Sequence, residues 1–331
     1  MKFSSIAGVA LVALGFIFLS FPGQCYGALE VGFYKGKCGI WDVESLVAGI
    51  VEEKFSNDPT IAPALIRMQF HDCFVKGCDA SILLDGPSSE KTAPPNLSVR
   101  GFDVIDAVKD VLETQIICPG VVSCADIIVM ATRDVIFLSG GGQYNVQTGR
   151  RDGLESLAKN VDLPGPQISV SDSTAAFQRK GLNVTDMVYL LGGHTVGVTH
   201  CFFFQDRLYN FQNTGRPDPS MDRELVKTLR LSCPQTSSGS NIVNLDQNPS
   251  SSSTVDNSYY TEIMEHRGVL QIDQALALDP ETSDTVTSIA RGSDFSTKFG
   301  QAMVKLGAIQ VLTGTQGEIR KSCRATNTPP S

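Results

Sequence analysis

Two histidines lie in sequence surroundings that suggest chemistry of different kinds. Arg67 and His71 are four positions apart, so on a helix both project from one face and present a base and a cation to one small space. His194 instead follows Gly192 and Gly193 and has no charged neighbour within several residues. The two glycines would let a flat, bulky group approach the backbone. A metal-bearing cofactor between the two histidines would account for both.

Length and composition place the chain in an ordinary class. It has 331 residues, of which 42% are hydrophobic, and a formal net charge of -8. These values are typical of a soluble globular protein with one large domain or two lobes. The negative charge, without a block of lysines or arginines, argues against a nucleic acid or an anionic membrane as the partner. The composition is compatible with small neutral or phenolic substrates.

The N-terminus has the features of a secretion signal. Lys2 supplies the positive start, residues 6–21 are mostly apolar, and small residues precede Gly27. We expect a signal peptide over residues 1–27, cleaved after Gly27. The apolar run is shorter than the roughly 20 residues of a membrane-spanning helix, so a membrane anchor is the less favoured alternative.

The cysteine count agrees with export. The chain has nine cysteines, and cleavage would remove Cys25 and leave an even number to pair in an oxidising compartment. Spacing alone leaves about a hundred pairings open, although Cys73 and Cys78 are close enough to close a local loop. No pair has the C-x-x-C spacing of a structural zinc site.

Apolar residues recur with the helical period along most of the chain. Residues 42–55 form one such stripe, with Asp42 as the expected N-cap. The others are residues 102–116, 124–136, 171–180, 185–191, 259–267 and 295–306. Sustained strand alternation is absent from the sequence, and residues 144–152 are the best place for a short strand or two. We therefore expect a mainly helical fold.

Four longer motifs resemble one known family. They are RMQFHDCFVKGCDASILLD at 67–85, VSCADI at 122–127, GRRDG at 149–153 and GGHTVG at 192–197. These motifs resemble those of the secretory plant (class III) haem peroxidases, and the match runs in order along essentially the whole chain after the expected signal. The resemblance implies one domain over residues 28–331, mainly α and two-lobed, with haem b between a distal and a proximal half.

The resemblance implies a role for each histidine. His194 would be the proximal iron ligand, and Asp273 would accept a hydrogen bond from its second ring nitrogen. On the distal side, His71 would carry a proton from the near to the far oxygen of hydrogen peroxide. Arg67 would stabilise the charge that develops on the leaving oxygen. Asn96 would accept a hydrogen bond from His71 and keep its tautomer.

Other roles concern access and substrates. By resemblance, Glu90 would support Asn96, and Phe70 would limit access to a ferryl oxidant that phenolic donors reduce in one-electron steps. The carbonyl of Pro164 would hold a phenolic hydroxyl, and Phe203 would line the entrance. Taken without the motifs, Phe70 would be an ordinary core residue and Pro164 part of a simple turn.

The resemblance also implies two calcium ions, which are hard cations that bind several oxygen atoms. The distal set is Asp72, Val75, Gly77, Asp79, Ser81 and Glu90. The proximal set is Thr195, Asp246, Ser251 and Asp256. The separation of Asp246 and Asp256 is longer than the family's usual spacing, so Ser251 is one choice among neighbouring serines. A solvated turn is the alternative to a proximal site.

The family pattern further implies the covalent features. It pairs Cys38 with Cys118, Cys73 with Cys78, Cys124 with Cys323, and Cys201 with Cys233. Asn183, in Asn-Val-Thr, is the expected glycosylation site. Asn96 also begins a sequon, but it cannot both carry a glycan and lie buried beside His71.

Two other functional classes are alternatives to a peroxidase. A secreted metal hydrolase would use His71, Asp72 and His194, yet the sequence has no H-E-x-x-H helix. A non-catalytic, disulfide-rich cell-wall protein would retain the fold without haem. For the peroxidase we expect a monomer in the apoplast or cell wall, because little chain follows Cys323 to direct it to a vacuole. His200 and His266 receive no role.

Overall fold

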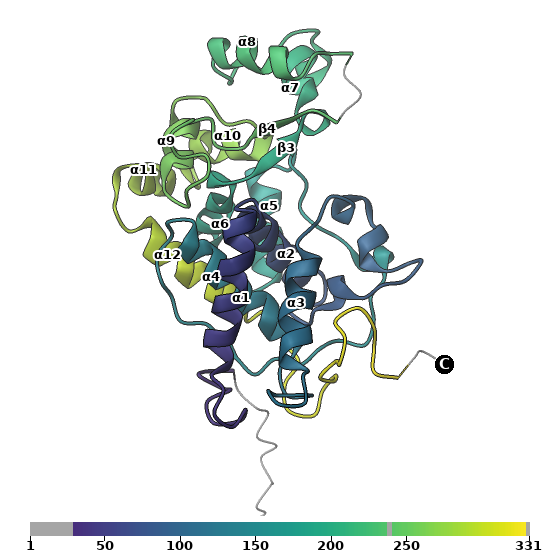
Figure 1. The fold of residues 1–331 in the computed structure, drawn as a ribbon. Helices are drawn as coiled ribbons and strands as arrows, with labels where there is room; N and C mark the ends of the chain where they lie inside the picture. The colour runs from purple at the N-terminus through teal and green to yellow at the C-terminus, as the bar shows by residue number, and fades with distance from the viewer. Residues whose placement is uncertain (1–28, 237–239, 329–331) are drawn as a thin grey trace, which may run out of the picture.

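Helices dominate the part of the chain that the computed structural model describes, residues 29–236 and 240–328 (Figure 1). The expected mainly helical fold is confirmed. The α-helices are α1 (Val43–Asn57), α2 (Ile61–Val75), α3 (Phe102–Leu112), α4 (Cys124–Leu138), α5 (Val170–Arg179), α6 (Val184–Leu191), α7 (Gln205–Tyr209), α8 (Arg223–Ser232), α9 (Ser258–Met264), α10 (Gln271–Leu278), α11 (Ser283–Arg291) and α12 (Phe295–Leu306). Short 3-10 helices lie at Ser81–Leu83, Glu90–Thr92, Pro94–Asn96, Ala158–Asn160, Gly192–Thr195, Cys201–Phe203 and Phe211–Asn213.

The strands of the described residues form two small antiparallel pairs. In the first, β1 (Glu30–Val31) pairs with β2 (Gln147–Thr148), which lies inside the segment expected to contain a strand. In the second, β3 (Val198–His200) pairs with β4 (Ile242–Asn244), a pairing that the sequence did not predict. The β3–β4 pair begins directly after the segment that carries His194 and so limits where that segment can lie.

Most predicted helices agree with the structure within two residues, and two end earlier than expected. Asp42 caps α1 by accepting a hydrogen bond from the backbone N–H of Ser45 at 2.7 Å. Helix α3 ends at Leu112, not at residue 116, because the N–H of Cys118 donates to the carbonyl of Leu112 and turns the chain back. Helix α9 ends at Met264, not at residue 267, because the chain turns through a left-handed residue, His266, with φ 63°.

Two hydrophobic cores divide the molecule, in agreement with the two-lobed expectation. One is built mainly from α1, α3 and α4, and the other from α5 to α12. Helix α2 contributes to both, with Leu65 and Met68 in the first core and Ile66 and Phe74 in the second. Figure 1 shows α1 to α4 side by side in the lower half and α7 to α11 in the upper half. A helix shared by both lobes is well placed to hold reactive groups rigidly between them.

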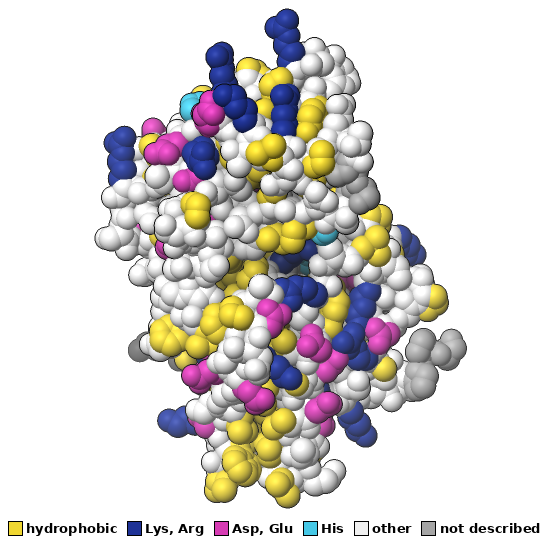
Figure 2. Space-filling view, turned by 45° about the horizontal axis from the view of Figure 1, so that its top comes forward, with side chains coloured by type: hydrophobic (Ala, Val, Ile, Leu, Met, Phe, Trp, Pro, Cys, Tyr) yellow, Lys and Arg dark blue, Asp and Glu magenta, His cyan; other side chains and the backbone are white. Residues whose placement is uncertain are grey.

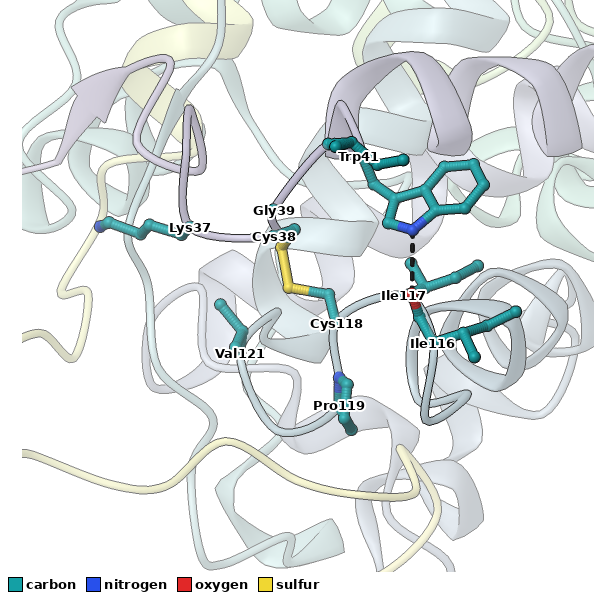
Figure 3. A pocket seen from close by; sticks show the side chains of 10 residues that line it. Lys37, Cys38, Gly39, Trp41, Ile116, Ile117, Cys118, Pro119 and Val121 are labelled. Carbon is teal, nitrogen blue, oxygen red and sulfur yellow. Dashed lines mark hydrogen bonds between the residues drawn. A yellow bond between two sulfur atoms is a disulfide. The ribbon is translucent and has the colours of Figure 1, made fainter.

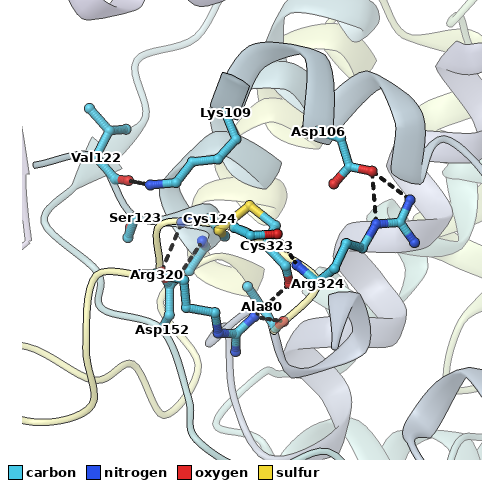
Figure 4. The surroundings of a disulfide bond; sticks show 12 residues. Ala80, Asp106, Lys109, Val122, Ser123, Cys124, Asp152, Arg320, Cys323 and Arg324 are labelled. Atoms are coloured by element: carbon cyan, nitrogen blue, oxygen red, sulfur yellow. Dashed lines mark hydrogen bonds and ion pairs between the residues drawn. A yellow bond between two sulfur atoms is a disulfide. The ribbon is translucent and has the colours of Figure 1, made fainter. Parts of the chain in front are cut away.

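Disulfides join segments that are distant in sequence. All four predicted pairings are confirmed, namely Cys38–Cys118, Cys73–Cys78, Cys124–Cys323 and Cys201–Cys233. The longest, with a sequence separation of 199, connects the start of α4 to the C-terminal segment (Figure 4). Beside it, Asp152 accepts from the N–H of Cys124, and buried Arg320 donates to the carbonyls of Ala80 and Cys323. This bridge therefore lies within a buried polar network that fixes the end of the chain.

The single tryptophan lines a surface pocket beside the Cys38–Cys118 disulfide (Figure 3). Trp41 Nε1 donates to the carbonyl of Ile116 at 2.9 Å, and the side chain of Ile116 itself is exposed. The pocket is formed by the turn before α1 and the segment after α3. Trp41 therefore packs on the N-terminal lobe, at a distance in sequence and structure from the segment of His194.

The expected signal peptide, residues 1–27, lies outside the described residues, and Cys25 lies within it. Within residues 29–236 and 240–328, no helix is both long and apolar enough to cross a membrane.

Candidate active site

Helix α2 carries the first group of side chains able to do chemistry. Arg67 and His71 lie one turn apart, and Arg67 Nε donates to His71 Nε2 at 3.2 Å. The guanidinium also donates to Ser98 Oγ at 3.0 Å and to the carbonyl of Pro95 at 2.8 Å. Arg67 is thus held by its own helix, by the 3-10 helix Pro94–Asn96 and by Ser98, which follows it.

The hydrogen bonds around His71 assign its tautomer. Asn96 Nδ2 donates to the carbonyl of Glu90 at 2.8 Å, which leaves Asn96 Oδ1 as the acceptor for His71 Nδ1 at 2.6 Å. His71 therefore carries its proton on Nδ1 and has a lone pair on Nε2, the nitrogen that faces Arg67. Glu90 supports Asn96 through its backbone carbonyl, not through its carboxylate. Asn96 is 2% exposed, so its side chain is not accessible to a glycan.

Burial and charge keep His71 unprotonated. Desolvation is the main cause, and the positive charge of Arg67 adds to it, so the pKa of His71 is lowered to about 4. The hydrogen bond that His71 Nδ1 donates to Asn96 opposes this shift of the pKa without reversing it. At neutral pH the ring is a free base beside a cation, which is the arrangement needed to accept a proton and to stabilise a developing negative charge.

His194 belongs to a second group, on the 3-10 helix Gly192–Thr195. Its Nδ1 lies 2.8 Å from Asp273 Oδ1, and the same oxygen accepts a hydrogen bond from Tyr259 at 3.0 Å. Burial, the largest single cause, would lower the pKa of His194, but the negative charge of Asp273 and the hydrogen bond to it together raise this pKa above its usual value. The side chain of Asp273 is fully buried, whereas that of His194 is 30% exposed. With Nδ1 engaged, Nε2 of His194 is the nitrogen left for another partner.

The two glycines before His194 allow close packing within the chain. A methyl group at Gly192 would lie 2.7 Å from the ring of Phe295 and would also overlap the hydroxyl of Tyr260. A methyl group at Gly193 would lie 3.3 Å from Ile66 on α2. The small residues therefore let the second core and α2 approach the backbone that carries His194.

The space between the two groups suits a large, flat and mainly apolar cofactor. Twelve residues of α2 are buried, while Pro63, Arg67 and Phe70, which share one face, are half-covered. Gly193, next to His194, packs against Ile66 of α2, so the two groups lie near each other. Figure 2 shows a hollow between the upper and lower parts of the molecule, with basic side chains and a histidine inside. Partly buried apolar side chains of the adjoining core include Leu163, Leu191 and Phe203.

The donors present also suit iron in particular. A neutral imidazole whose second nitrogen is bonded to a carboxylate is a typical protein ligand of haem iron. His194 and Asp273 form that pair, and the half-covered face of α2 carries a base and a guanidinium near it. The residues present therefore fit an iron porphyrin.

Buried carboxylates gather where α2 ends. Burial, followed by the charges of Asp79 and Glu90, raises the pKa of Asp72 well above its usual value, and burial raises that of Glu90 to about 7. Asp72 accepts from the N–H of Ala80 at 3.0 Å, while both carboxylate oxygens of Glu90 and the hydroxyl of Ser81 are buried without a hydrogen-bond partner. Unpartnered oxygens beside mutually repelling carboxylates fit a hard cation.

Backbone oxygens would have to complete that site. Among the described residues, no three His, Cys, Asp or Glu side chains converge closely enough to bind an ion by themselves. The loop bends sharply at Gly77, with φ +114°, where a side chain would overlap the carbonyl of Gln310. The carbonyl of Val75 accepts a hydrogen bond from Lys180 Nζ at 2.9 Å. Val75 and Gly77 thus lie in the loop between Asp72 and Asp79, as the distal set requires.

The proximal set forms two pairs of contacting side chains. Thr195 Oγ1 lies 3.2 Å from the carbonyl of Thr254 and 3.4 Å from Asp256 Oδ1. Ser251 Oγ donates to Asp246 Oδ2 at 3.2 Å, so Ser251 contacts one of the two carboxylates of the set. The carbonyl of Thr254 belongs with this group, and the sequence did not predict it because any residue type can supply a carbonyl.

The residues expected to bind donors lie at adjoining turns. Gln167, three residues after Pro164, donates from its side chain to the carbonyl of Phe203 at 2.7 Å. Phe203 and Pro164 are both half-buried.

The expected glycosylation site, Asn183, is exposed and caps α6 through a hydrogen bond from the N–H of Asp186 at 2.8 Å. Its Nδ2, the atom that a glycan would modify, is not used in that cap.

Sequence reasoning missed several residues of the site. Tyr259 contacts Asp273, and Ser98 and Pro95 hold Arg67. A buried tyrosine on an amphipathic helix is more often a core residue, so no pattern distinguished Tyr259. His266, which received no role, is exposed as expected.

Comparison with known proteins places these residues in a wider context. A family model described as Peroxidase matches residues 47–292, which include both histidine segments. The chain is 54% identical to Peroxidase 60 of Arabidopsis thaliana over 328 residues, 98% of each chain. It is 49% identical to Peroxidase 57 of the same plant, over 97% of this chain and 99% of the relative. Probable peroxidase 61 is also 49% identical, over 89% of this chain and 87% of the relative.

Proposed function

The chain belongs to the peroxidase family, as a plant haem peroxidase of class III, and from this premise we propose that Arg67 and His71 cleave hydrogen peroxide at a haem bound by His194. The observation that carries the proposal is the pair of oriented imidazoles. His71 has its lone pair on Nε2 beside a guanidinium, and His194 has its Nδ1 bonded to a buried carboxylate.

His71 and Arg67 divide the work of breaking the peroxide bond. When bound, the haem supplies the two electrons that split the oxygen–oxygen bond and later recovers single electrons from donors. His71 Nε2 takes the proton of the near peroxide oxygen and delivers it to the far oxygen, which leaves as water. Arg67 stabilises the negative charge on the departing oxygen, and it is already oriented by Ser98 and Pro95 before the substrate arrives.

The remaining groups hold these residues in place. Asn96 keeps the His71 proton on Nδ1, so that Nε2 can act as the base. Asp273 orients the His194 ring and increases its electron donation. Phe70, half-buried on the same face of α2, restricts what can approach the iron to small oxidants. The distal set would bind one calcium ion at the end of α2, and the proximal set a second beside His194.

The rate of reaction with peroxide should fall only in strong acid. His71 must be neutral to accept a proton, and its pKa is lowered to about 4, so the rate should be constant above that pH and fall about tenfold per unit below it. The Arg67→Leu variant removes one cause of the lowered pKa, so its acid limb should move to higher pH. Stopped-flow rates across the acid range test this. A limb that stays in place in the variant would contradict the electrostatic coupling of the two residues.

Chelation of calcium should destabilise the protein. Without the distal ion, Asp72, Asp79 and Glu90 repel one another in a buried site. Each site occupied at a hundredfold excess of calcium over its Kd should add about 2.7 kcal/mol to the free energy of unfolding. Calorimetry with calcium and with EGTA measures the difference.

Two variants serve as comparisons for the calcium measurement. In Asp72→Asn, EGTA should lower the free energy of unfolding by less than in the native protein, because the distal site no longer contributes. In Asp110→Asn, at an exposed position on α3, EGTA should lower it as much as in the native protein. An equal EGTA effect in both variants would exclude the distal site.

The substrates follow from the geometry of the entrance and from the family. We propose hydrogen peroxide as the oxidant and small phenols as the one-electron donors, bound where Pro164 and Phe203 lie at adjoining turns. Four disulfides and a hydrophobic leader support secretion to the apoplast or cell wall. Asn183 is the proposed glycan acceptor, since its Nδ2 is free on an exposed helix cap.

A steady-state assay tests the function. The purified protein, reconstituted with hemin and calcium, should oxidise a panel of small phenols at rates that depend on hydrogen peroxide. A folded protein that binds no hemin and oxidises no phenol would support the non-catalytic wall protein. Hydrolysis of esters or peptides without hemin would support the metal hydrolase.

A further inference from the structure

Asp273 is a buried carboxylate with few partners. Its oxygen Oδ1 accepts two hydrogen bonds from side chains. His194 Nδ1 donates one at 2.8 Å, and the hydroxyl of Tyr259 donates the other at 3.0 Å. The other oxygen, Oδ2, is buried and has no hydrogen-bond partner among the described residues. In the same part of the chain, no lysine or arginine forms an ion pair with Asp273. The negative charge of Asp273 is therefore stabilised by two side-chain donors, and both of them bind the same oxygen.

Tyr259 is the second of these donors, and it is rigidly held. It lies on α9, is 1% exposed, and packs edge-on against the ring of His194, with 6.1 Å between centroids. Burial, followed by the charge of Asp273, raises the pKa of Tyr259 well above its usual value, so the phenol remains a donor at physiological pH. Its ring also packs edge-on against Tyr260, with 5.0 Å between centroids.

The segment between α9 and α10 is fixed as well, so the distance from Tyr259 to Asp273 is well defined. Arg207, which is 1% exposed, donates from Nη1 to the carbonyls of Gly268, Val269 and Leu270, at 2.7, 2.7 and 2.9 Å. These three residues directly precede the helix that carries Asp273.

We propose that Tyr259 is a positioning residue that sets the reduction potential of the haem iron. It does so by weakening the hydrogen bond that Asp273 accepts from His194 Nδ1. The inference rests on the proposed role of His194 as the iron ligand. A hydrogen bond to a charged group is stronger than one between neutral groups, so the phenol neutralises part of the carboxylate charge. Less charge remains to pull on the Nδ1 proton, and the imidazole donates less electron density to the iron.

The sign of the effect follows directly. Without the phenol, Asp273 would bind the His194 proton more tightly, and the ring would become more like an imidazolate. Stronger donation stabilises ferric over ferrous iron, so the reduction potential should fall. The bond between iron and imidazole should stiffen at the same time.

Helix α9 offers a matched control. Tyr260 is as deeply buried as Tyr259 and is its neighbour in sequence, but its hydroxyl donates to the carbonyl of Val188 at 2.8 Å. Tyr260→Phe therefore removes a buried hydroxyl from the same helix without removing a hydrogen bond to Asp273. If the loss of a buried hydroxyl only weakens the packing of α9, both variants should change the reduction potential equally.

The experiment measures the ferric–ferrous midpoint potential by spectroelectrochemistry and the iron–imidazole stretch by resonance Raman. Tyr259→Phe should shift the potential to more negative values and the stretch to higher frequency, whereas Tyr260→Phe should match the native protein. Asp273→Asn should shift both quantities in the opposite direction. Equal shifts in the two tyrosine variants, or no shift in Tyr259→Phe, would overturn the proposal.

A second substitution covers the case in which Tyr259→Phe does not fold. With 3-fluorotyrosine in place of Tyr259 the ring stays but the phenol is a stronger donor, so the potential should rise; an unchanged potential would overturn the inference. If the native protein takes up no haem, the proposed function fails and this inference with it. If the native protein binds haem through His194 and neither substitution moves the potential, the inference alone fails.

Discussion

The His71→Ala variant should bind haem as the native protein does and react with hydrogen peroxide about 10² to 10⁴ times more slowly. Alanine removes the lone pair of Nε2 that takes the peroxide proton, while Arg67 stays in place through Ser98 and Pro95. His194 and Asp273 are untouched, so haem binding should persist. Stopped-flow absorbance after mixing with peroxide gives the rate, and the Soret band before mixing gives the haem content.

The comparison for this variant is another histidine. His266 is exposed and contacts the carbonyl of Ser220, so His266→Ala should react at the native rate. A His71→Ala variant that retains the native rate would remove His71 from the role of the base. A variant that loses its haem would instead point to a structural role.

Replacing both Cys124 and Cys323 by alanine should lower the free energy of unfolding by about 5 kcal/mol in the chain-entropy model, the largest loss among the four bridges. The bridge closes a loop with a sequence separation of 199, so its removal frees most of the unfolded chain. Denaturant unfolding, at fixed calcium and haem concentrations, measures the loss. The rate of reaction with peroxide should change little in the protein that remains folded, because neither cysteine contacts the histidines.

The shortest bridge provides the contrast. Cys73–Cys78 has a sequence separation of 5, and the same relation gives about 2 kcal/mol for its removal. Because this bridge closes the loop that contains Val75 and Gly77, its loss should also weaken the response to calcium. If the two double variants lost equal stability, loop closure would not explain what these bridges contribute.

Much of the fold was predictable because its helices have strong periodicity. The segments that became α1, α3 and α12 place apolar residues on one buried face, and that pattern depends on local sequence alone. Helices α8 and α11 were missed: they are polar overall, and α8 buries three residues and α11 two. The pairing of β3 with β4 was missed because it joins segments far apart in sequence.

The site shows a similar division. Arg67 and His71 were predictable because four-residue spacing on a helix is a local property. The partners of Asp273 were not, because Tyr259 and His194 reach it from separate elements that only the fold brings together. The packing role of Gly192 was not predictable for the same reason, since the atoms close to it belong to Phe295 and Tyr260.

The most direct measurement is a hemin titration of the oxidised, calcium-loaded protein beside its His194→Ala variant, followed in the Soret region. The native protein should bind hemin in equimolar amount, with the spectrum of a histidine-bound iron that changes on addition of hydrogen peroxide. The variant should lack that spectrum. A native protein that stays colourless, or a variant whose spectrum is identical to that of the native protein, would contradict the assignment of His194 and the account built on it.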